Sequence, residues 1–420
     1  MPRTEQANKS DDLIRELQAR RNAVLMCLPA NGVVIIRAAT KKVRSNDTHY
    51  TYRQNSHFYY LTSLDTAGTL CVMTHQETIL FYKPQDPVYE RWEGKLPTAE
   101  EIQAQTGCSH MLPISEFTTW CEKNLKKNIK IYGRVDDKAW YKQWWSGEFA
   151  EIDNMVMQLR AVKSDAEINL LQHACNITVQ AQQETIKNSK KFRSESIIAG
   201  YFKWACHHRG APHLAYNSIV AQGNNACVLH YHALTSQIDD DNCILMDAGA
   251  EYMNYAADIT RVWPSRGKFT AEQKAIYEAC LAVQKQCIAH VKPGVTLRDL
   301  NSICEIATCQ KLQDLGFLQA SIEEIKEKGL HKPFFCHSVG HSIGLDVHDP
   351  MDKDRKLEKN MVITIEPGIY ISQENTQVSS GFRGIGVRIE DMVCVTENAS
   401  LVMSSSLEKS IKDIESLCSG

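Results

Sequence analysis

The sequence lacks the features that would place it in a membrane or on a polyanion. No stretch approaches the ~20 consecutive apolar residues that a membrane-spanning helix needs. The first residues contain no apolar signal core and carry Glu5, Asp11 and Asp12, which argues against a secretory or organellar presequence in this form of the chain. The formal net charge is −3 with acidic and basic residues interspersed, so charge indicates no nucleic-acid-binding surface. We therefore expect a cytoplasmic protein with no nucleic-acid or membrane partner.

The sequence also lacks any Cys-x-x-Cys pair, although it contains 15 cysteines. Several of these cysteines occur in helical patterns among apolar residues, as Cys280 and Cys287 do, and as Cys304 and Cys309 do. An odd number of cysteines in such positions is typical of reduced thiols in a protein core.

The length of 420 residues predicts two or three domains. Residues 11–21 are expected to form a helix, and strands are expected in the segments NGVVIIRAA, TLCVMTH and TILFYK, with helical stretches near 98–106 and 136–145. These elements predict an α/β N-terminal domain over residues 1–160.

The pattern changes around Arg160, where a second domain, residues 161–420, is expected to begin. A long helix should run from Ser164 to about Asn188, another should cover 194–209, and strands are expected around 216–221, around 243–263 and after 360. Three capping boxes predict helix starts: Ser164 with Glu167, Thr270 with Gln273, and Thr296 with Asp299. Strands at both ends with helices between them favour an α+β domain.

Carboxylates follow apolar runs in this second domain. Asp247 follows Ile244 to Met246, and Glu366 follows Val362 to Ile365 and precedes a Pro-Gly turn. A charge beside a core strand must be paired or bound to metal, because leaving it alone costs several kcal/mol. These carboxylates therefore indicate a buried polar site.

Two further carboxylates are expected at the same place. If the chain turns near Tyr252 to Asn254, Asp258 comes to lie beside Asp247 on one face of a hairpin. By the two-residue period of a strand, Glu390 shares a face with Arg388. Like charges so close repel, so the arrangement favours cations between them.

Three histidines lie within twelve residues, at His337, His341 and His348. Gly340 and Gly344 lie among them and argue against a long helix, and the first histidine is not followed by the glutamate of a helical metalloprotease motif. We interpret the set as one metal ligand and two acid/base or substrate-contacting groups.

Five short segments, in this order and at these intervals, carry a family resemblance. The strings MDAG, ADITR, HSVGHSIGLDVHD, ITIEPGIY and GVRIED resemble the metal-site signature of the pita-bread metallopeptidases, most closely the Xaa-Pro aminopeptidases (aminopeptidase P). The segment VRSNDTHYTYRQNSHFYYLTSL resembles the N-terminal domain of the same enzymes, so the similarity extends from about Val43 to Thr396. It implies a C-terminal pita-bread catalytic domain preceded by a smaller α/β domain with a role in oligomerisation and substrate access.

The resemblance also implies the roles of the ligands. Asp258 and Glu390 would bridge two metal ions, Asp247 would complete one site, and His341 with Glu366 would complete the other. Four carboxylates and one imidazole suit Mn²⁺, and less clearly Co²⁺, Fe²⁺ or Zn²⁺. A water between two ions ~3.5–4 Å apart becomes a hydroxide that attacks the peptide carbonyl.

Other positions match residues around the substrate. His230 would stabilise the oxyanion, Glu366 would accept the water proton, and His348 would assist at the leaving proline nitrogen. His337 matches a substrate-contacting histidine, and Arg388 an arginine near the bridging glutamate, whereas Ser338 and Ser342 depart from many relatives and leave the shape of the pocket open. The expected substrate-binding residues are His230, His337, His348, Arg388, Trp92 and Tyr216.

The expected substrates are peptides with proline at the second position. Trp92 matches a tryptophan that in relatives reaches a neighbouring subunit's site, which implies a homo-oligomer, a dimer or a tetramer. Two alternatives stay open: a prolidase that cleaves only Xaa-Pro dipeptides, and a catalytically inactive binding module on the same scaffold, which the presence of all five ligands disfavours.

Overall fold

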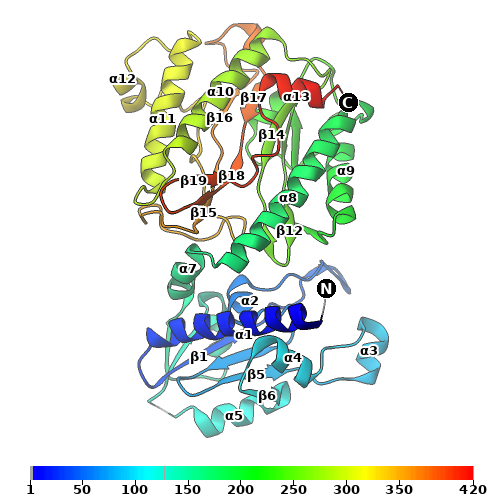
Figure 1. Cartoon of the computed structure of the whole chain (residues 1–420), viewed down its shortest axis with the longest axis vertical. Helices are drawn as coiled ribbons and strands as arrows, with labels where there is room; N and C mark the ends of the chain where they lie inside the picture. The colour runs from blue at the N-terminus through cyan, green and yellow to red at the C-terminus, as the bar shows by residue number, and fades with distance from the viewer. Residues whose placement is uncertain (1–2, 127, 420) are drawn as a thin grey trace. The chain divides into compact units, whose positions relative to one another are not determined.

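The computed structural model describes residues 3–126 and 128–419 and divides into two compact units, Met1–Arg160 and Ala161–Gly420 (Figure 1). The main strands of the N-terminal unit are β1 (Gly32–Arg37), β4 (Leu70–Met73), β5 (Thr78–Tyr82), β6 (His110–Pro113), β7 (Lys130–Gly133) and β8 (Glu148–Glu151). They form one mixed sheet in the order β6-β5-β4-β1-β7-β8, in which β1 is antiparallel to β4 and parallel to β7. The three predicted strands are β1, β4 and β5. A separate hairpin is made by β2 (Val43–Ser45) and β3 (Thr48–His49).

Helices accompany this sheet: α1 (Arg3–Met26), α2 (Ser56–Thr62), α3 (Pro87–Glu93), α4 (Ala99–Thr106), α5 (Phe117–Asn124), α6 (Lys138–Tyr141) and α7 (Asp153–Ala161). Helix α1 packs against α2 and α4, and Thr98 opens α4 with a capping box. The prediction of a helix over 136–145 was too long, because α6 ends at Tyr141. Beyond it Gln143 and Trp144 donate backbone hydrogen bonds to the carbonyl oxygens three residues earlier, as in a turn, and Trp144 packs edge-on against Phe117 with ring centroids 5.4 Å apart.

Antiparallel strands make up the sheets of the C-terminal unit. They are β9 (His213–Leu214), β10 (Ile219–Gln222), β11 (Cys243–Asp247), β12 (Ala250–Tyr252), β13 (Tyr255–Ala256), β14 (Thr260–Pro264), β15 (Val362–Ile365), β16 (Gly368–Ile371), β17 (Ile385–Arg388), β18 (Asp391–Val395) and β19 (Ser400–Val402). Their pairing gives the orders β10-β11-β14, β13-β12-β9, β15-β18-β19 and β16-β17. Early and late strands of the unit thus form separate sheets.

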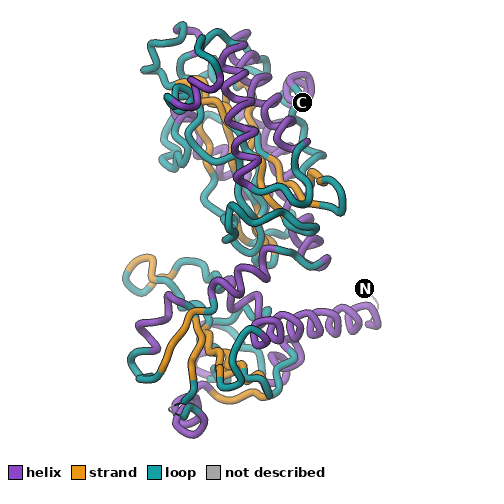
Figure 2. Tube along the Cα trace, turned by 90° about the vertical axis from the view of Figure 1, so that its left-hand side faces the viewer, coloured by secondary structure: helices purple, strands orange, loops and turns teal. Residues whose placement is uncertain are grey.

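Helices run beside these strands (Figure 2): α8 (Asp165–Asn188), α9 (Glu195–His208), α10 (Ala271–Ala289), α11 (Leu297–Asp314), α12 (Ile322–Glu327) and α13 (Ile411–Leu417). All three predicted capping boxes are present, at Ser164, Thr270 and Thr296. Helix α10 contacts β15, β16 and β17, and α8 contacts α9, β12 and β13. The α+β prediction for this unit is confirmed.

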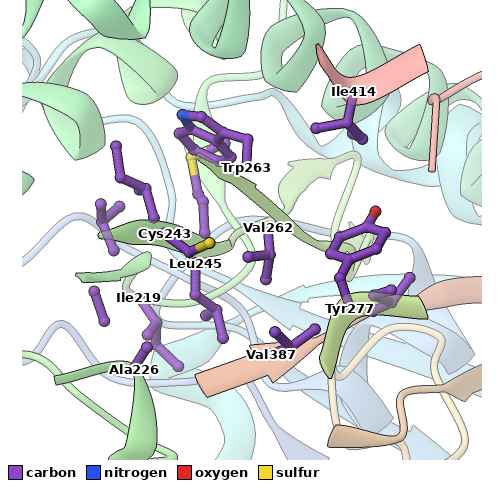
Figure 3. Packing of buried hydrophobic residues seen from close by; sticks show 14 of the residues in the cluster. Ile219, Ala226, Cys243, Leu245, Val262, Trp263, Tyr277, Val387 and Ile414 are labelled. Atoms are coloured by element: carbon purple, nitrogen blue, oxygen red, sulfur yellow. The ribbon is translucent and has the colours of Figure 1, made fainter. Parts of the chain in front are cut away.

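Apolar side chains from early and late strands meet in one core (Figure 3). Leu245 of β11, Val262 of β14 and Val387 of β17 lie there with Tyr277 of α10 and Ile414 of α13, all nearly or completely buried. The four helical cysteines singled out in the sequence are also buried. This core fixes the strand ends that carry the polar site.

Among residues 3–126 and 128–419, none of the helices combines the length and the hydrophobicity of a membrane span.

Candidate metal centre

A tight hairpin brings Asp247 and Asp258 together. Strand β11 pairs with β14 so that Asp247 lies opposite Thr260, and the chain reverses through Met253 and Asn254, whose φ angles are +48° and +64°. Two successive positive φ angles are typical of the type I′ turns that join hairpin strands. The predicted turn at Tyr252 to Asn254 is thus confirmed.

Gly249 makes this hairpin possible, because a Cβ there would lie 1.7 Å from the carbonyl oxygen of Ala257. At the hairpin, the hydroxyl of Tyr216 lies 2.5 Å from Oδ1 of both Asp247 and Asp258. A hydroxyl carries one hydrogen and can donate to only one carboxylate at a time. The two carboxylates therefore require positive charge from elsewhere.

His341 reaches the same point from a segment that pairs with β15. Its backbone N–H donates to Thr364 Oγ1, and Nε2 lies 3.4 Å from both Asp258 Oδ2 and Glu366 Oε1. Nδ1 lies 3.0 Å from the carbonyl oxygen of Ser342 and donates to it, which leaves the lone pair of Nε2 free. This is the tautomer of a metal-ligating histidine.

The glycine next to this histidine is required by the packing. A Cβ on Gly340 would lie 1.9 Å from the carbonyl oxygen of Thr364, so only glycine lets the His341 segment approach β15 so closely. Glu366 itself lies between β15 and β16, where strand β15 ends as predicted, but the predicted Pro-Gly turn is wrong. Ile365 pairs with Asp391 and Gly368 with Arg388 in one continuing register, so the chain runs on through Pro367 without reversing. The structure describes no helix in the 331–350 segment, as its glycines predicted.

Glu390 completes the cluster from the connection between β17 and β18. Its side chain is buried, and Oε2 accepts a hydrogen bond of 2.7 Å from Thr260 Oγ1. One possible ligand atom each from Asp258, His341 and Glu390 lie within 4.8 Å of one another. Such convergence of carboxylate and imidazole atoms fits a divalent cation.

A buried ion pair holds the backbone next to Glu390. Arg261 Nη1 donates to the Glu390 carbonyl oxygen at 2.6 Å, and Arg261 Nη2 lies 2.7 Å from Asp391 Oδ1. Burial would by itself raise the pKa of Asp391, but the charges of Arg261 and Lys409 outweigh it and hold that pKa well below its usual range. The backbone that carries Glu390 is therefore held by a buried carboxylate, Asp391, whose negative charge is neutralised by Arg261 and Lys409.

The carboxylates of the site itself are poorly compensated. Burial, reinforced by the neighbouring carboxylates, raises the pKa values of Asp258 and Glu390 well above the usual range, and burial raises that of Glu366. The guanidinium of Arg388 reaches only Asp247, at 2.7 Å. The donor set therefore fits divalent cations, whose charge would stabilise the ionised carboxylates.

Arg388 links two groups that the sequence did not indicate. Its Nη1 donates to Tyr370 Oη at 3.1 Å, and its Nε donates to Thr260 Oγ1 at 3.3 Å. Tyr370 Oη in turn lies 2.8 Å from His337 Nε2. Thr260 and Tyr370 belong to the strings ADITR and ITIEPGIY, but the sequence analysis assigned neither a role, and only the fold shows which groups they contact.

His337 and His348, the histidines predicted to contact substrate, lie around the cluster. Burial and the charge of Arg388 lower the pKa of His337 to about 4, so its ring is neutral near pH 7. The ring of His348 stands edge-on to that of His341, with centroids 4.5 Å apart. Desolvation and the charges of His341 and His230 lower its pKa. His348 makes no close contact with the carboxylates comparable to that of His341.

A cavity of about 400 Å³ opens onto the cluster, and both His230 and Tyr216 lie in its wall. The structure therefore brings ten of the eleven sequence-predicted site residues together: Asp247, Asp258, His341, Glu366, Glu390, His230, His337, His348, Arg388 and Tyr216. The eleventh, Trp92, belongs to α3 of the other unit and is 82% exposed. Lys353 also lines the cavity and was missed in the sequence, where it is one of several lysines in a loop.

The raised pKa values predict how pH affects the metal-free protein. A carboxyl whose pKa is higher in the folded than in the unfolded state contributes stability below the unfolded pKa and loses it as pH rises through the folded pKa. A cation that binds only the folded state restores this loss. The difference in Tm between protein with added Mn²⁺ and dialysed metal-free protein should therefore increase from pH 5 to pH 7.5. Thermal unfolding at several pH values tests this, and a difference that stays flat or shrinks contradicts it.

Comparisons with known proteins agree with this geometry. The family model for metallopeptidase family M24 matches residues 169–397, and that for the aminopeptidase P N-terminal domain matches residues 17–132. The Xaa-Pro aminopeptidase of Haemophilus influenzae is 37% identical over 420 residues, covering 96% of each chain.

Solved structures are similar over the same length. Aminopeptidase PepP of Pseudomonas aeruginosa matches with a TM-score of 0.92 at 31% identity, covering 96% of this chain and 98% of that one. Aminopeptidase P of E. coli with the inhibitor Pro-Leu matches with a TM-score of 0.91 at 30% identity, again covering 96% and 98%. The resemblance seen in the sequence and the pita-bread fold it implied are confirmed. The chain therefore belongs to metallopeptidase family M24 and is a metal-dependent peptidase that carries the N-terminal domain of aminopeptidase P.

Proposed function

We propose that this chain removes the first residue from peptides whose second residue is proline, with two divalent ions, expected to be Mn²⁺. The observation that carries the proposal is the convergence of four carboxylates and His341 in one cavity, where Asp258 and Glu390 are buried and Asp247 and Glu366 are partly exposed. Similarity to Xaa-Pro aminopeptidases over 96% of the chain supports the substrate class and does not favour the prolidase or inactive-module alternatives.

We assign the ligands as the resemblance implied. Asp258 and Glu390 would hold both ions, Asp247 would complete one site, and His341 with Glu366 the other. The distances of 3.4 Å from His341 Nε2 to Asp258 and to Glu366 support this grouping. When bound, the ions would supply an activated water and positive charge opposite the developing oxyanion.

The protein groups have separate tasks in the proposed reaction. Glu366, whose pKa is raised by burial, accepts the proton of the attacking water. His230 donates to the carbonyl oxygen of the scissile bond and stabilises the negative charge that develops on it. The leaving proline nitrogen is tertiary in the substrate and must gain a proton, which His348 helps to deliver.

Proline must be recognised by shape, because its nitrogen has no N–H to donate. His337, neutral and held by Tyr370 and by the Ser338 carbonyl oxygen, provides a fixed wall of the cavity, and Tyr216 provides another. The E. coli relative was solved with Pro-Leu, a dipeptide that begins with proline. We propose that the site of this chain accepts the proline ring in the same cavity.

Two features of the assembly are also proposed. We propose that Trp92, which is 82% exposed, reaches the site of a neighbouring subunit in a homo-oligomer, because aromatic side chains are enriched in contacts between proteins. The N-terminal unit would then serve oligomerisation and substrate access.

We further propose that the enzyme acts in the cytoplasm, in keeping with its reduced cysteines.

The substrate class is tested by offering three peptides to the Mn²⁺-loaded protein. We expect cleavage of an Xaa-Pro-Yaa tripeptide and little or no cleavage of a matched Xaa-Ala-Yaa tripeptide, because the cavity wall selects the proline ring. An Xaa-Pro dipeptide is the third substrate. Product analysis that finds cleavage of the dipeptide alone would establish a prolidase, and cleavage of none would establish a binding module.

A further inference from the structure

The loop that carries His230 has little secondary structure to hold it. Residues 228–237 follow a short 3-10 turn and form no strand, yet Leu229, His230 and His232 line the catalytic cavity. Leu234 adopts a φ of +51°, an uncommon conformation for a residue with a side chain. A strained, exposed loop needs a tether if it is to keep a side chain in place.

Glu195, the first residue of α9, supplies this tether. It is completely buried, and its two oxygens accept four hydrogen bonds. Oε1 accepts from the backbone N–H of Gln222 at 3.2 Å and from Asn225 Nδ2 at 3.0 Å. Oε2 accepts from Tyr231 Oη at 2.8 Å and from the backbone N–H of Ser236 at 3.1 Å. The carboxylate therefore holds the segment just before the loop, Ser236 near the end of the loop, and Tyr231, the residue next to His230.

The partners of Glu195 are connected to one another as well. Asn225 Nδ2 lies 3.0 Å from Tyr231 Oη and 2.8 Å from Ser236 Oγ, and the backbone N–H of Glu195 donates to the Ser236 carbonyl oxygen at 3.1 Å. None of these partners is a cation. A buried carboxylate held only by neutral donors is costly to desolvate, and its place at a helix N-terminus offsets part of that cost.

We propose that Glu195 is a positioning residue for the reaction: it fixes the 228–237 loop so that the imidazole of His230 stays over the scissile carbonyl. The inference rests on the proposed role of His230. An interaction made only with the developing oxyanion affects kcat more than KM. Loss of the tether should therefore reduce kcat while the metal ligands, which lie on other segments, keep their metal.

Glu195→Gln is the sharpest variant, because it keeps the size of the side chain. An amide has one acceptor oxygen, so its NH₂ group must face either the Gln222 N–H or the Ser236 N–H, and one backbone donor loses its partner. We expect kcat to fall roughly 10- to 100-fold, the range for a displacement of about 1 Å in a reacting group. KM and metal content should change little.

Helices α8 and α9 also provide a pair of control residues, Glu184 and Tyr201. Glu184 accepts from Tyr201 Oη at 2.9 Å, as Glu195 does from Tyr231, but it contacts no part of the loop. Glu184→Gln and Tyr201→Phe should leave kcat at the wild-type value. Tyr231→Phe, the milder partner variant, should lower kcat by about threefold to tenfold, the effect of one lost hydrogen bond.

A double-mutant cycle with His230→Ala separates positioning from general support of the fold. If Glu195 acts through His230, Glu195→Gln should reduce kcat by no more than roughly twofold once the imidazole is absent, which is within the error of additivity. The same factor of 10 to 100 in both backgrounds overturns the inference about Glu195 and leaves the proposed function intact. Wild-type kcat in His230→Ala alone overturns the role of His230 and with it this inference. If Glu195→Gln lowers Tm sharply or loses metal, Tyr231→Phe is taken through the same cycle and decides.

Discussion

Glu390→Ala is expected to abolish peptidase activity and to lower metal occupancy. Glu390 is 1% exposed and is the carboxylate proposed to neutralise both ions, so its loss leaves them with one negative charge fewer. Removing a residue that only supports a metal ligand lowers metal affinity by roughly 10- to 100-fold, so removing a bridging ligand should lower it further. Elemental analysis after dialysis and calorimetric titration with Mn²⁺ measure the effect.

A suitable control is Glu397→Ala, the same change at an exposed position close after β18. Glu397 pairs with Lys359 at 2.8 Å on the surface, an interaction worth at most about 1 kcal/mol. This variant should keep wild-type activity and metal. Two metals per chain and near-normal turnover in Glu390→Ala would remove Glu390 from the bridging position.

His348→Ala is expected to keep its metal and lose roughly 10²- to 10⁴-fold in kcat, the usual range for a general acid or base. The spacing of the histidines alone allows His341 and His348 to exchange roles. In the structure, His341 Nε2 faces Asp258 and Glu366, whereas His348 stands beside the cluster in the cavity wall. His341→Ala should therefore lose metal, and His348→Ala should not.

The comparison needs a histidine far from the chemistry. His290 is exposed at the end of α10, where Nδ1 lies 2.8 Å from the Gln286 carbonyl oxygen, and His290→Ala should leave both kcat and metal unchanged. Metal loss in His348→Ala together with metal retention in His341→Ala would show that the two assignments are reversed. A pH–rate profile adds a second test, since an unchanged acid limb in His348→Ala would exclude His348 as the titrating group.

Local features of the fold could be predicted because their causes lie within a few residues. The capping box of Ser164 with Glu167 and the hairpin turn at Tyr252 to Asn254 are of this kind, and both are found. The family resemblance supplied the ligand set as a whole. Its residues meet at one cavity, but their roles remain to be tested by the variants above.

The supporting residues could not be predicted, because their partners are distant in sequence. Thr260 bonds Glu390 across 130 positions, and Glu195 bonds the Ser236 N–H across 41. Neither a threonine in a strand nor a glutamate at a helix start is unusual by itself. The expected face shared by Arg388 and Glu390 is confirmed, because both line the cavity while Val387 and Ile389 are buried in the core, although β17 itself ends at Arg388.

The separation of the two sheets along the chain has a consequence for biosynthesis. The ribosome synthesises the Asp247–Asp258 hairpin before Glu366 and Glu390, which lie more than 100 residues later, next to strands β15 and β18. During translation the hairpin is an incomplete chelator with two repelling carboxylates, and the selective ligand set exists only after the late strands have paired. We therefore expect metal loading to be a late step of maturation. We also expect the ion acquired to depend on what the compartment offers at that moment as well as on the proposed ligands.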